Sequence, residues 1–175
     1  EDYRAKYKRL GRRVIVSTPD LLHKLPESTW VPNLVPIHDP AFQPRPGNHS
    51  GTGPVRVVQA PTRKFDKHTA EFRSVAKELA PRFPQAEFHV LEMMAYREVL
   101  AFKRRSHVVF DHMNGHFGIS SLESLSQGVP VIAGLDDWNI AKIREFTGAA
   151  ELPWVIARDR EQLRDRTAEL LASPA

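Results

Sequence analysis

The chain has 175 residues, of which 41% are hydrophobic and 26% are charged, and it contains no cysteine. These proportions are ordinary for a globular protein of one or two domains and exclude a disordered, collagen-like or coiled-coil chain. The lack of cysteine excludes a disulfide framework, a thiolate nucleophile and a cysteine-based zinc site. No apolar run approaches the ~20 residues that a membrane-spanning helix needs, and the first residues are charged rather than apolar. We therefore expect a cytoplasmic protein without a transmembrane segment.

The net charge of +4 is concentrated at the beginning of the chain. Residues 1–13 contain six of the 25 basic residues but only two of the 21 acidic residues, so the rest of the chain is neutral. The six basic residues are Arg4, Lys6, Lys8, Arg9, Arg12 and Arg13. Such a segment suits an anionic surface or a nucleic acid. It equally suits a solvated helix face before the first strand, and both interpretations are kept.

A proline-rich stretch divides the sequence into two parts. Nine of the 14 prolines lie between Pro19 and Pro61, and residues 32–54 end in a run of glycine, serine and threonine. We interpret residues 32–54 as a hinge or linker. Before it, residues 14–17 and 29–31 are predicted strands and residues 20–24 a helical turn. Residues 1–31 are therefore a separate N-terminal segment with too few elements to form a domain alone.

Strand and helix patterns alternate five times after the linker. The predicted strands cover residues 55–60, 86–91, 107–111, 129–133 and 154–157, and the predicted helices cover 69–80, 96–105, 119–127, 137–146 and 160–172. Five successive βα units predict an α/β domain over residues 55–175, a Rossmann-like, doubly wound parallel sheet with helices on both faces. Ligands bind such sheets beyond the carboxyl ends of the strands, so the loops after Ala60, Asp111 and Ala133 are the candidate sites.

Two of these loops carry residues suited to a phosphorylated ligand. Arg63, Lys64 and Lys67 follow the first strand of the domain and precede a helix, where a phosphate or diphosphate is the natural partner. Ordinary surface lysines and arginines would give the same pattern.

The second loop leads from Asp111 through Gly118 into the helix predicted at residue 119. Glycine permits close approach to the backbone, and the N–H groups of Ile119, Ser120 and Ser121 can hold phosphate oxygens. The Glu123 carboxylate suits a pair of ribose hydroxyls. The alternative is that Ser120 caps the helix and Glu123 complements the helix dipole.

The segment FGISSLESLSQGVPVIA resembles the donor-site signature of retaining GT-B glycosyltransferases of the group 1 type, and PTRKFDKHT resembles the basic loop of the same nucleotide-sugar-binding domain. The resemblance implies that Arg63 and Lys67 neutralise the diphosphate of a UDP-, GDP- or ADP-sugar and so stabilise the leaving group. It implies that Glu123 binds the ribose hydroxyls and that the backbone of residues 118–121 cradles the phosphates or the sugar. In this scheme the enzyme needs neither a metal nor a cofactor.

The sequence also departs from the family pattern. Gly115 stands where the family often has its first glutamate, on the side of the donor sugar, and His116 and His68 replace glycines of the pattern. Residues 1–31 resemble the end of the family's acceptor domain, most of which is not in this sequence. The resemblance thus implies the donor-binding part of a glycosyltransferase, inactive as this chain alone, whose acceptor is unknown and whose acceptor domain is missing from this sequence.

Three other interpretations are compatible with the sequence. A non-catalytic GT-B-like binding or assembly module would keep the fold without the chemistry, and Gly115 and His116 favour it. A nucleic-acid-binding protein would bind its ligand through the basic arm, residues 1–13. Asp111, His112 and His116 are the side chains nearest to a metal-site pattern, but two histidines and one aspartate are too few for a typical zinc site, so we expect no metal.

Overall fold

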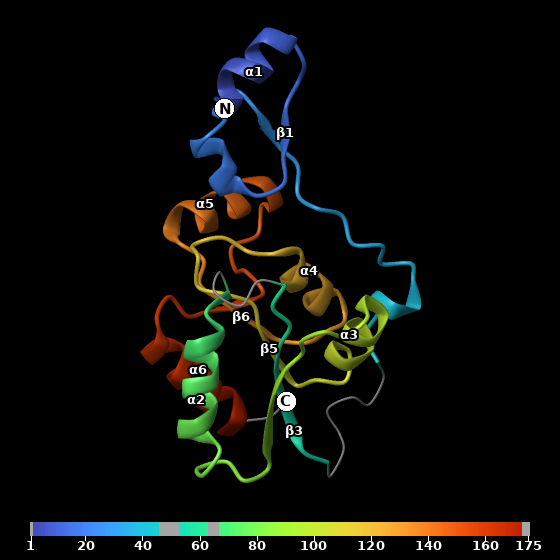
Figure 1. Ribbon diagram of the computed structural model, residues 1–175, viewed down its shortest axis with the longest axis vertical. Helices are drawn as coiled ribbons and strands as arrows, with labels where there is room; N and C mark the ends of the chain where they lie inside the picture. Colours follow the sequence, from blue (N-terminus) through green and yellow to red (C-terminus); the bar gives the residue numbers. More distant parts are fainter. Residues whose placement is uncertain (1, 46–52, 63–66, 173–175) are drawn as a thin grey trace. The chain divides into compact units, whose positions relative to one another are not determined.

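The computed structural model describes residues 2–45, 53–62 and 67–172. Contacts divide the chain into two compact units, one formed by Glu1–Leu34 with Asp136–Leu152 and one by Val35–Leu135 with Pro153–Ala175. The second unit holds the parallel sheet and the candidate site (Figure 1). The predicted domain boundaries at residues 31 and 54 stay a prediction, while the contacts group residues 136–152 with the N-terminal segment.

A five-stranded, entirely parallel sheet confirms the predicted α/β fold class. Its strands are β3 (Val55–Gln59), β4 (Ala86–Val90), β5 (Val108–Phe110), β6 (Val131–Ala133) and β7 (Trp154–Ile156), in the spatial order β4-β3-β5-β6-β7. The register pairs Val57 of β3 with Phe88 of β4 on one side and with Val108 of β5 on the other. The chain order therefore reverses at β3, which creates a topological switch point between β3 and β5.

Helices cover both faces of the sheet, as a parallel sheet requires. The helices α2 (Thr69–Leu79) and α6 (Arg160–Ala172) pack on one face, where Phe72, Val75 and Leu163 join the buried side chains of the strands. Figure 1 shows α3 (Tyr96–Lys103) and α4 (Ile119–Ser126) on the other side. The Phe72 ring stacks on the Phe110 ring of β5, with 5.7 Å between centroids.

The helix ends follow the local signals in the sequence. The Asp159 carboxylate accepts from the backbone N–H of Gln162 at 2.8 Å, which satisfies a free donor at the start of α6. Gly128 follows α4 with a φ of 74°, the left-handed conformation that glycine adopts at helix ends. The predicted strands are each one or two residues longer than those observed, because the strand pattern extends into the flanking loops.

The N-terminal unit contains α1 (Tyr3–Leu10), β1 (Ile15–Val16), the 3₁₀ helix η1 (Pro19–His23), β2 (Thr29–Trp30) and α5 (Asp137–Thr147). β1 and β2 pair as a two-stranded parallel sheet. Asp2 caps α1 by accepting from the backbone N–H of Arg4. The six basic residues of the arm thus lie on or just after a helix.

The segment interpreted as a linker contains a second 3₁₀ helix, η2 (Pro40–Phe42). Phe42 is buried, and Gln127 donates to the carbonyl of Ala41 at 2.7 Å. Burial of the Phe42 ring explains why η2 packs against α3 and α4. Among the residues that the structure describes, no helix is long and apolar enough to cross a membrane.

Candidate functional site

The candidate site lies at the switch point, where the loops after β3 and β5 meet. Lys67 precedes α2, and Asp111 follows β5 directly. The Lys67 ammonium lies 2.7 Å from one oxygen of the Asp111 carboxylate. The fold therefore brings the two predicted phosphate-binding loops into direct contact. Arg63 and Lys64 lie outside the described residues.

Asp111 organises the start of α4. Its second carboxylate oxygen accepts from the backbone N–H of Gly118 at 2.7 Å and from the Ser121 hydroxyl at 2.6 Å. Burial opposes ionisation of this carboxyl, but His112, the Lys67 ammonium and the hydrogen bonds from Lys67 and Ser121 outweigh it and lower the pKa of Asp111. The result is a buried carboxylate that fixes both a cation and the amino end of a helix.

A side chain at position 118 would crowd the Asp111 and Lys67 side chains. A Cβ atom at this position would lie 3.0 Å from both Asp111 Oδ2 and Lys67 Nζ. Gly118 is the N-cap of α4 and no side-chain cap bond forms there, so the alternative in which Ser120 caps the helix is wrong. The glycine therefore admits the Asp111 and Lys67 side chains to the N-terminus of α4.

Glu123 lies one turn into α4 and is almost completely buried. One of its carboxylate oxygens accepts from the Lys103 ammonium at 2.8 Å, and the other accepts from the Tyr96 hydroxyl at 2.6 Å. Lys103 is fully buried and also donates to the carbonyl and the hydroxyl of Ser120, at 2.9 and 3.0 Å. One buried cation from α3 thus bonds to both Ser120 and Glu123, which lie a turn apart on α4.

Sequence reasoning missed Lys103 and Tyr96. Burial lowers the pKa of Lys103, although the attraction of Glu123 opposes this. Partial burial of the Tyr96 hydroxyl, together with its hydrogen bond to the Glu123 carboxylate, raises the pKa of Tyr96 to about 12. A signal was available, because Tyr96, Leu100 and Lys103 share one face of a helix at spacings of four and three residues. A lysine on the inward stripe of a helix indicates a buried partner.

Three histidines surround the same loops. The His68 Nδ1 accepts from the backbone N–H of Met113 at 3.2 Å, and the rings of His112 and His116 lie 4.7 Å apart. Burial lowers the pKa of His112 to about 4, so its ring is neutral at pH 7. Within the described ranges no group of three or more His, Cys, Asp or Glu side chains could hold a metal ion.

The remaining predicted residues flank this centre. Gly115 has a φ of 84° and forms an isolated parallel bridge with Leu135, which extends the pairing of β5 and β6 into their loops. His116 is half-buried, and Ile119 has 47% of its surface exposed at the first turn of α4. The loop after Ala133 therefore contacts the same region through Leu135.

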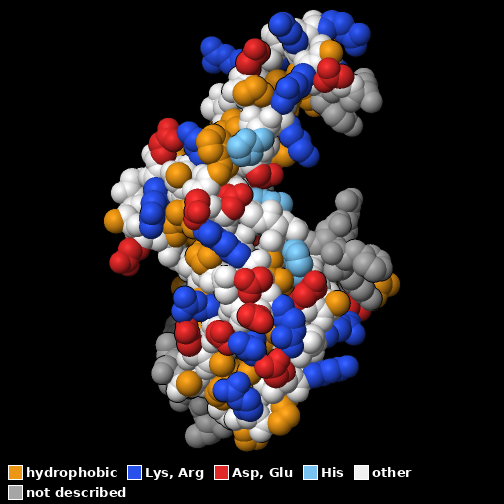
Figure 2. Space-filling model, turned by 90° about the vertical axis from the view of Figure 1, so that its left-hand side faces the viewer, with side chains coloured by type: hydrophobic (Ala, Val, Ile, Leu, Met, Phe, Trp, Pro, Cys, Tyr) orange, Lys and Arg blue, Asp and Glu red, His pale blue; other side chains and the backbone are white. Residues whose placement is uncertain are grey.

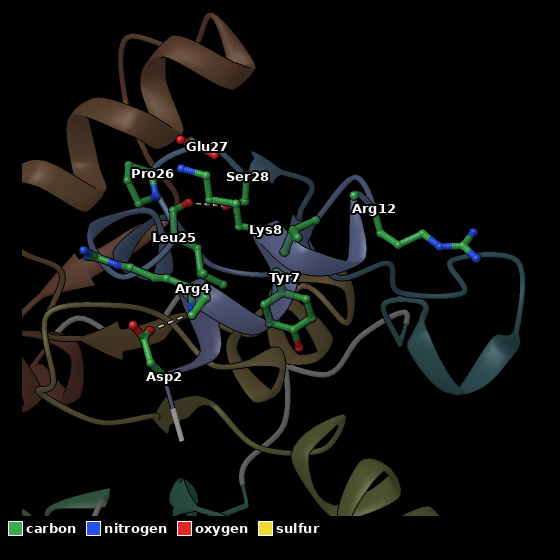
Figure 3. Close-up of a pocket in the computed structure, with 12 residues that line it drawn as sticks. Asp2, Arg4, Tyr7, Lys8, Arg12, Leu25, Pro26, Glu27 and Ser28 are labelled. Atoms are coloured by element: carbon green, nitrogen blue, oxygen red, sulfur yellow. Dashed lines mark hydrogen bonds between the residues drawn. The ribbon is translucent and has the colours of Figure 1, made fainter.

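A separate cavity of about 480 Å³ lies within the N-terminal unit, against α1 (Figure 3). Its lining includes Arg4, Tyr7, Lys8 and Arg12, but also the acidic Asp2 and Glu27. Arg4 is already engaged, since it donates to the carbonyls of His23 and Lys24. Figure 2 shows lysine and arginine side chains gathered around this helix.

Solved structures share the fold. The C-terminal domain of a glycosyl transferase group 1 family protein (LpcC) from Francisella tularensis matches at a TM-score of 0.56 and 17% identity, over 80% of this chain and 89% of that domain. The pneumococcal O-GlcNAc transferase GtfA, solved with UDP and GlcNAc, matches at 0.55 and 15% identity, over 97% of this chain and 40% of its own. A chain of a GtfA/B complex matches at 0.61 and 11% identity, over 98% and 41%.

The chain therefore has the fold of the C-terminal half of a GT-B glycosyltransferase. It spans about 40% of the length of the two longer chains. No protein-family model matches the sequence, and no curated protein matches it.

Proposed function

We propose that this chain is the donor-binding domain of a glycosyltransferase and holds a nucleotide-diphosphate sugar for retaining transfer. The observation that carries the proposal is that the Lys67 ammonium and the N-terminus of α4 meet at the switch point. Lys67 Nζ lies 2.7 Å from Asp111 Oδ1, and the backbone nitrogen of Gly118 lies 2.7 Å from Asp111 Oδ2. A lysine and a helix N-terminus are together a favourable environment for a diphosphate. The shared fold and the resemblance of the sequence support the same assignment.

The chemistry follows from the charge that a departing nucleoside diphosphate develops. Lys67 keeps 19% of its side chain exposed, and the Asp111 bond uses one of the three N–H groups of its ammonium. The others are suited to phosphate oxygens, so that charge on the leaving group is neutralised by a preorganised donor. Arg63 is proposed to act beside Lys67.

The test is binding of UDP, GDP and ADP, each with its monophosphate and nucleoside, to the whole chain by titration calorimetry. Lys67→Ala is expected to weaken diphosphate binding at least tenfold, as loss of a charge-assisted contact does, and to leave nucleoside binding unchanged. Lys77→Ala, on the exposed face of α2, is the matched control and should leave both unchanged. Equal losses for diphosphate and nucleoside in Lys67→Ala would refute the phosphate role.

A second candidate is a non-catalytic assembly module. It is favoured by the internal counter-charges, because Asp111 already pairs with Lys67, and Lys103 already pairs with Glu123. Gly115 in place of a glutamate points the same way, and one solved structure with this fold is a GtfA/B complex. A folded wild-type chain that binds none of the nine nucleotides and nucleosides would favour this candidate over donor binding.

A further inference from the structure

The two oxygens of Glu123 have different surroundings. Oε2 faces Lys103, whose ammonium has three N–H groups and three acceptors, namely Oε2 and the two oxygens of Ser120. Lys103 is fully buried, so this oxygen is held by the interior of the domain. Oε1 instead accepts from Tyr96, a residue with 58% of its surface exposed. Only Oε1 therefore has a partner that can move into solvent.

Tyr96 is placed where its side chain can move. It is the first residue of α3, directly after the N-cap Ala95, whose backbone N–H donates to Glu98. The preceding loop contains Met93, which has a positive φ of 56° and is fully exposed. The backbone of α3 is therefore fixed by its own cap, while the phenol is tied to the domain by its bond to Glu123 in the described contacts.

We propose that the Tyr96 hydroxyl, by donating to Glu123 Oε1, occupies the position of a ribose hydroxyl, and that a bound ribonucleotide displaces it. The inference rests on the proposed function and refines it. Lys103 already donates to Oε2, so Glu123 has one oxygen, Oε1, rather than two to accept from the ribose. Phenol and ribose both present an O–H donor to a carboxylate, so one can substitute for the other. Tyr96 then sets the affinity of the site, since the binding-competent form is the fraction in which its hydroxyl has left Oε1.

The decisive variant is Tyr96→Phe, which keeps the ring and removes only the hydroxyl. We expect it to bind the preferred ribonucleoside diphosphate roughly tenfold more tightly than the wild type, since a hydrogen bond to a charged group contributes on that scale. The 2′,3′-dideoxy analogue has no hydroxyl for Glu123, so its affinity should be the same in both proteins. Tyr7→Phe, in the N-terminal unit, is the matched control and should bind like the wild type.

Carbon-13 labelling of the tyrosine rings gives a direct readout, because the chain has three tyrosines. The ribonucleotide should shift the Tyr96 signal, and the dideoxy analogue should not. Equal or weaker ribonucleotide binding by a folded Tyr96→Phe variant would overturn the inference and leave the donor site intact. If neither protein binds any nucleotide, the proposed function fails, and the inference fails with it.

Discussion

Acidification should destabilise the fold through His112. Its ring is 1% exposed, and burial lowers its pKa from 6.5 to about 4. The backbone N–H of Asn114 donates to its Nδ1 at 3.3 Å, which fixes Nδ1 as an acceptor and the neutral ring as the native form. Protonation in the folded state must therefore break this bond and charge a buried ring.

The sign follows from proton linkage. Between pH 6.5 and about 4 the unfolded chain binds a proton at His112 that the native protein does not bind, so stability falls as the pH falls. The loss over the whole window is about 3 kcal/mol, of which about 2 kcal/mol is complete by pH 4.5. The lowered pKa of Asp111 adds nothing in this window, because its contribution is lost only below its usual value of 3.8.

The assay is urea unfolding followed by circular dichroism, at pH 7 and at pH 4.5. In His112→Gln the free energy of unfolding should change by about 2 kcal/mol less between the two pH values than in the wild type. The control His38→Gln removes an exposed histidine and should follow the wild type. If His112→Gln and the wild type lose the same free energy of unfolding between pH 7 and pH 4.5, the assignment of this ring as buried and neutral is wrong.

Two further predictions concern packing around the site. Lys103→Met should lower the free energy of unfolding by about 3–5 kcal/mol, because it leaves Glu123 as a buried, unpaired charge. The control Arg166→Met, in an exposed pair on α6, should lower it by under about 0.5 kcal/mol. Urea unfolding measures both values, and a Lys103→Met variant as stable as the wild type would contradict the buried pair. Gly134→Ala should cost about 3 kcal/mol, because its Cβ would lie 2.6 Å from Met113 Cα and 2.8 Å from the Ala157 carbonyl oxygen, while a Cβ at Gly53 meets no atom of the described residues within 4 Å. A thermal scan in which both alanine variants melt together would refute this.

The fold was predictable because the local signals agree with one another. Alternating strand and helix patterns placed all ten elements of the five βα units to within two residues. The grouping of α5 with the N-terminal segment was not predictable. The apolar stripe through Ile143 shows that this helix is covered on one face, but a periodic pattern does not say by which part of the chain.

The site was predictable only in part, because contacts between distant positions leave little trace in one sequence. Loop position and chemistry indicated that Lys67 and residues 118–123 belong to one region. That Asp111 joins Lys67 to Gly118, across 44 and seven positions of the chain, follows only from the strand order. The burial of His112 likewise depends on the close approach of the loops after β5 and β6, where Gly134 donates to its carbonyl.

Counter-charges within the fold have a consequence for any ligand of this site. Lys67 and Glu123, the two charged side chains proposed to bind the donor, each have an opposite charge in contact within the described structure. A diphosphate then shares the Lys67 ammonium with Asp111, whereas a ribose hydroxyl competes with Tyr96 for Glu123. Such a site stays assembled because its charges remain paired, and its affinity is lower by the free energy of the bonds that the ligand replaces.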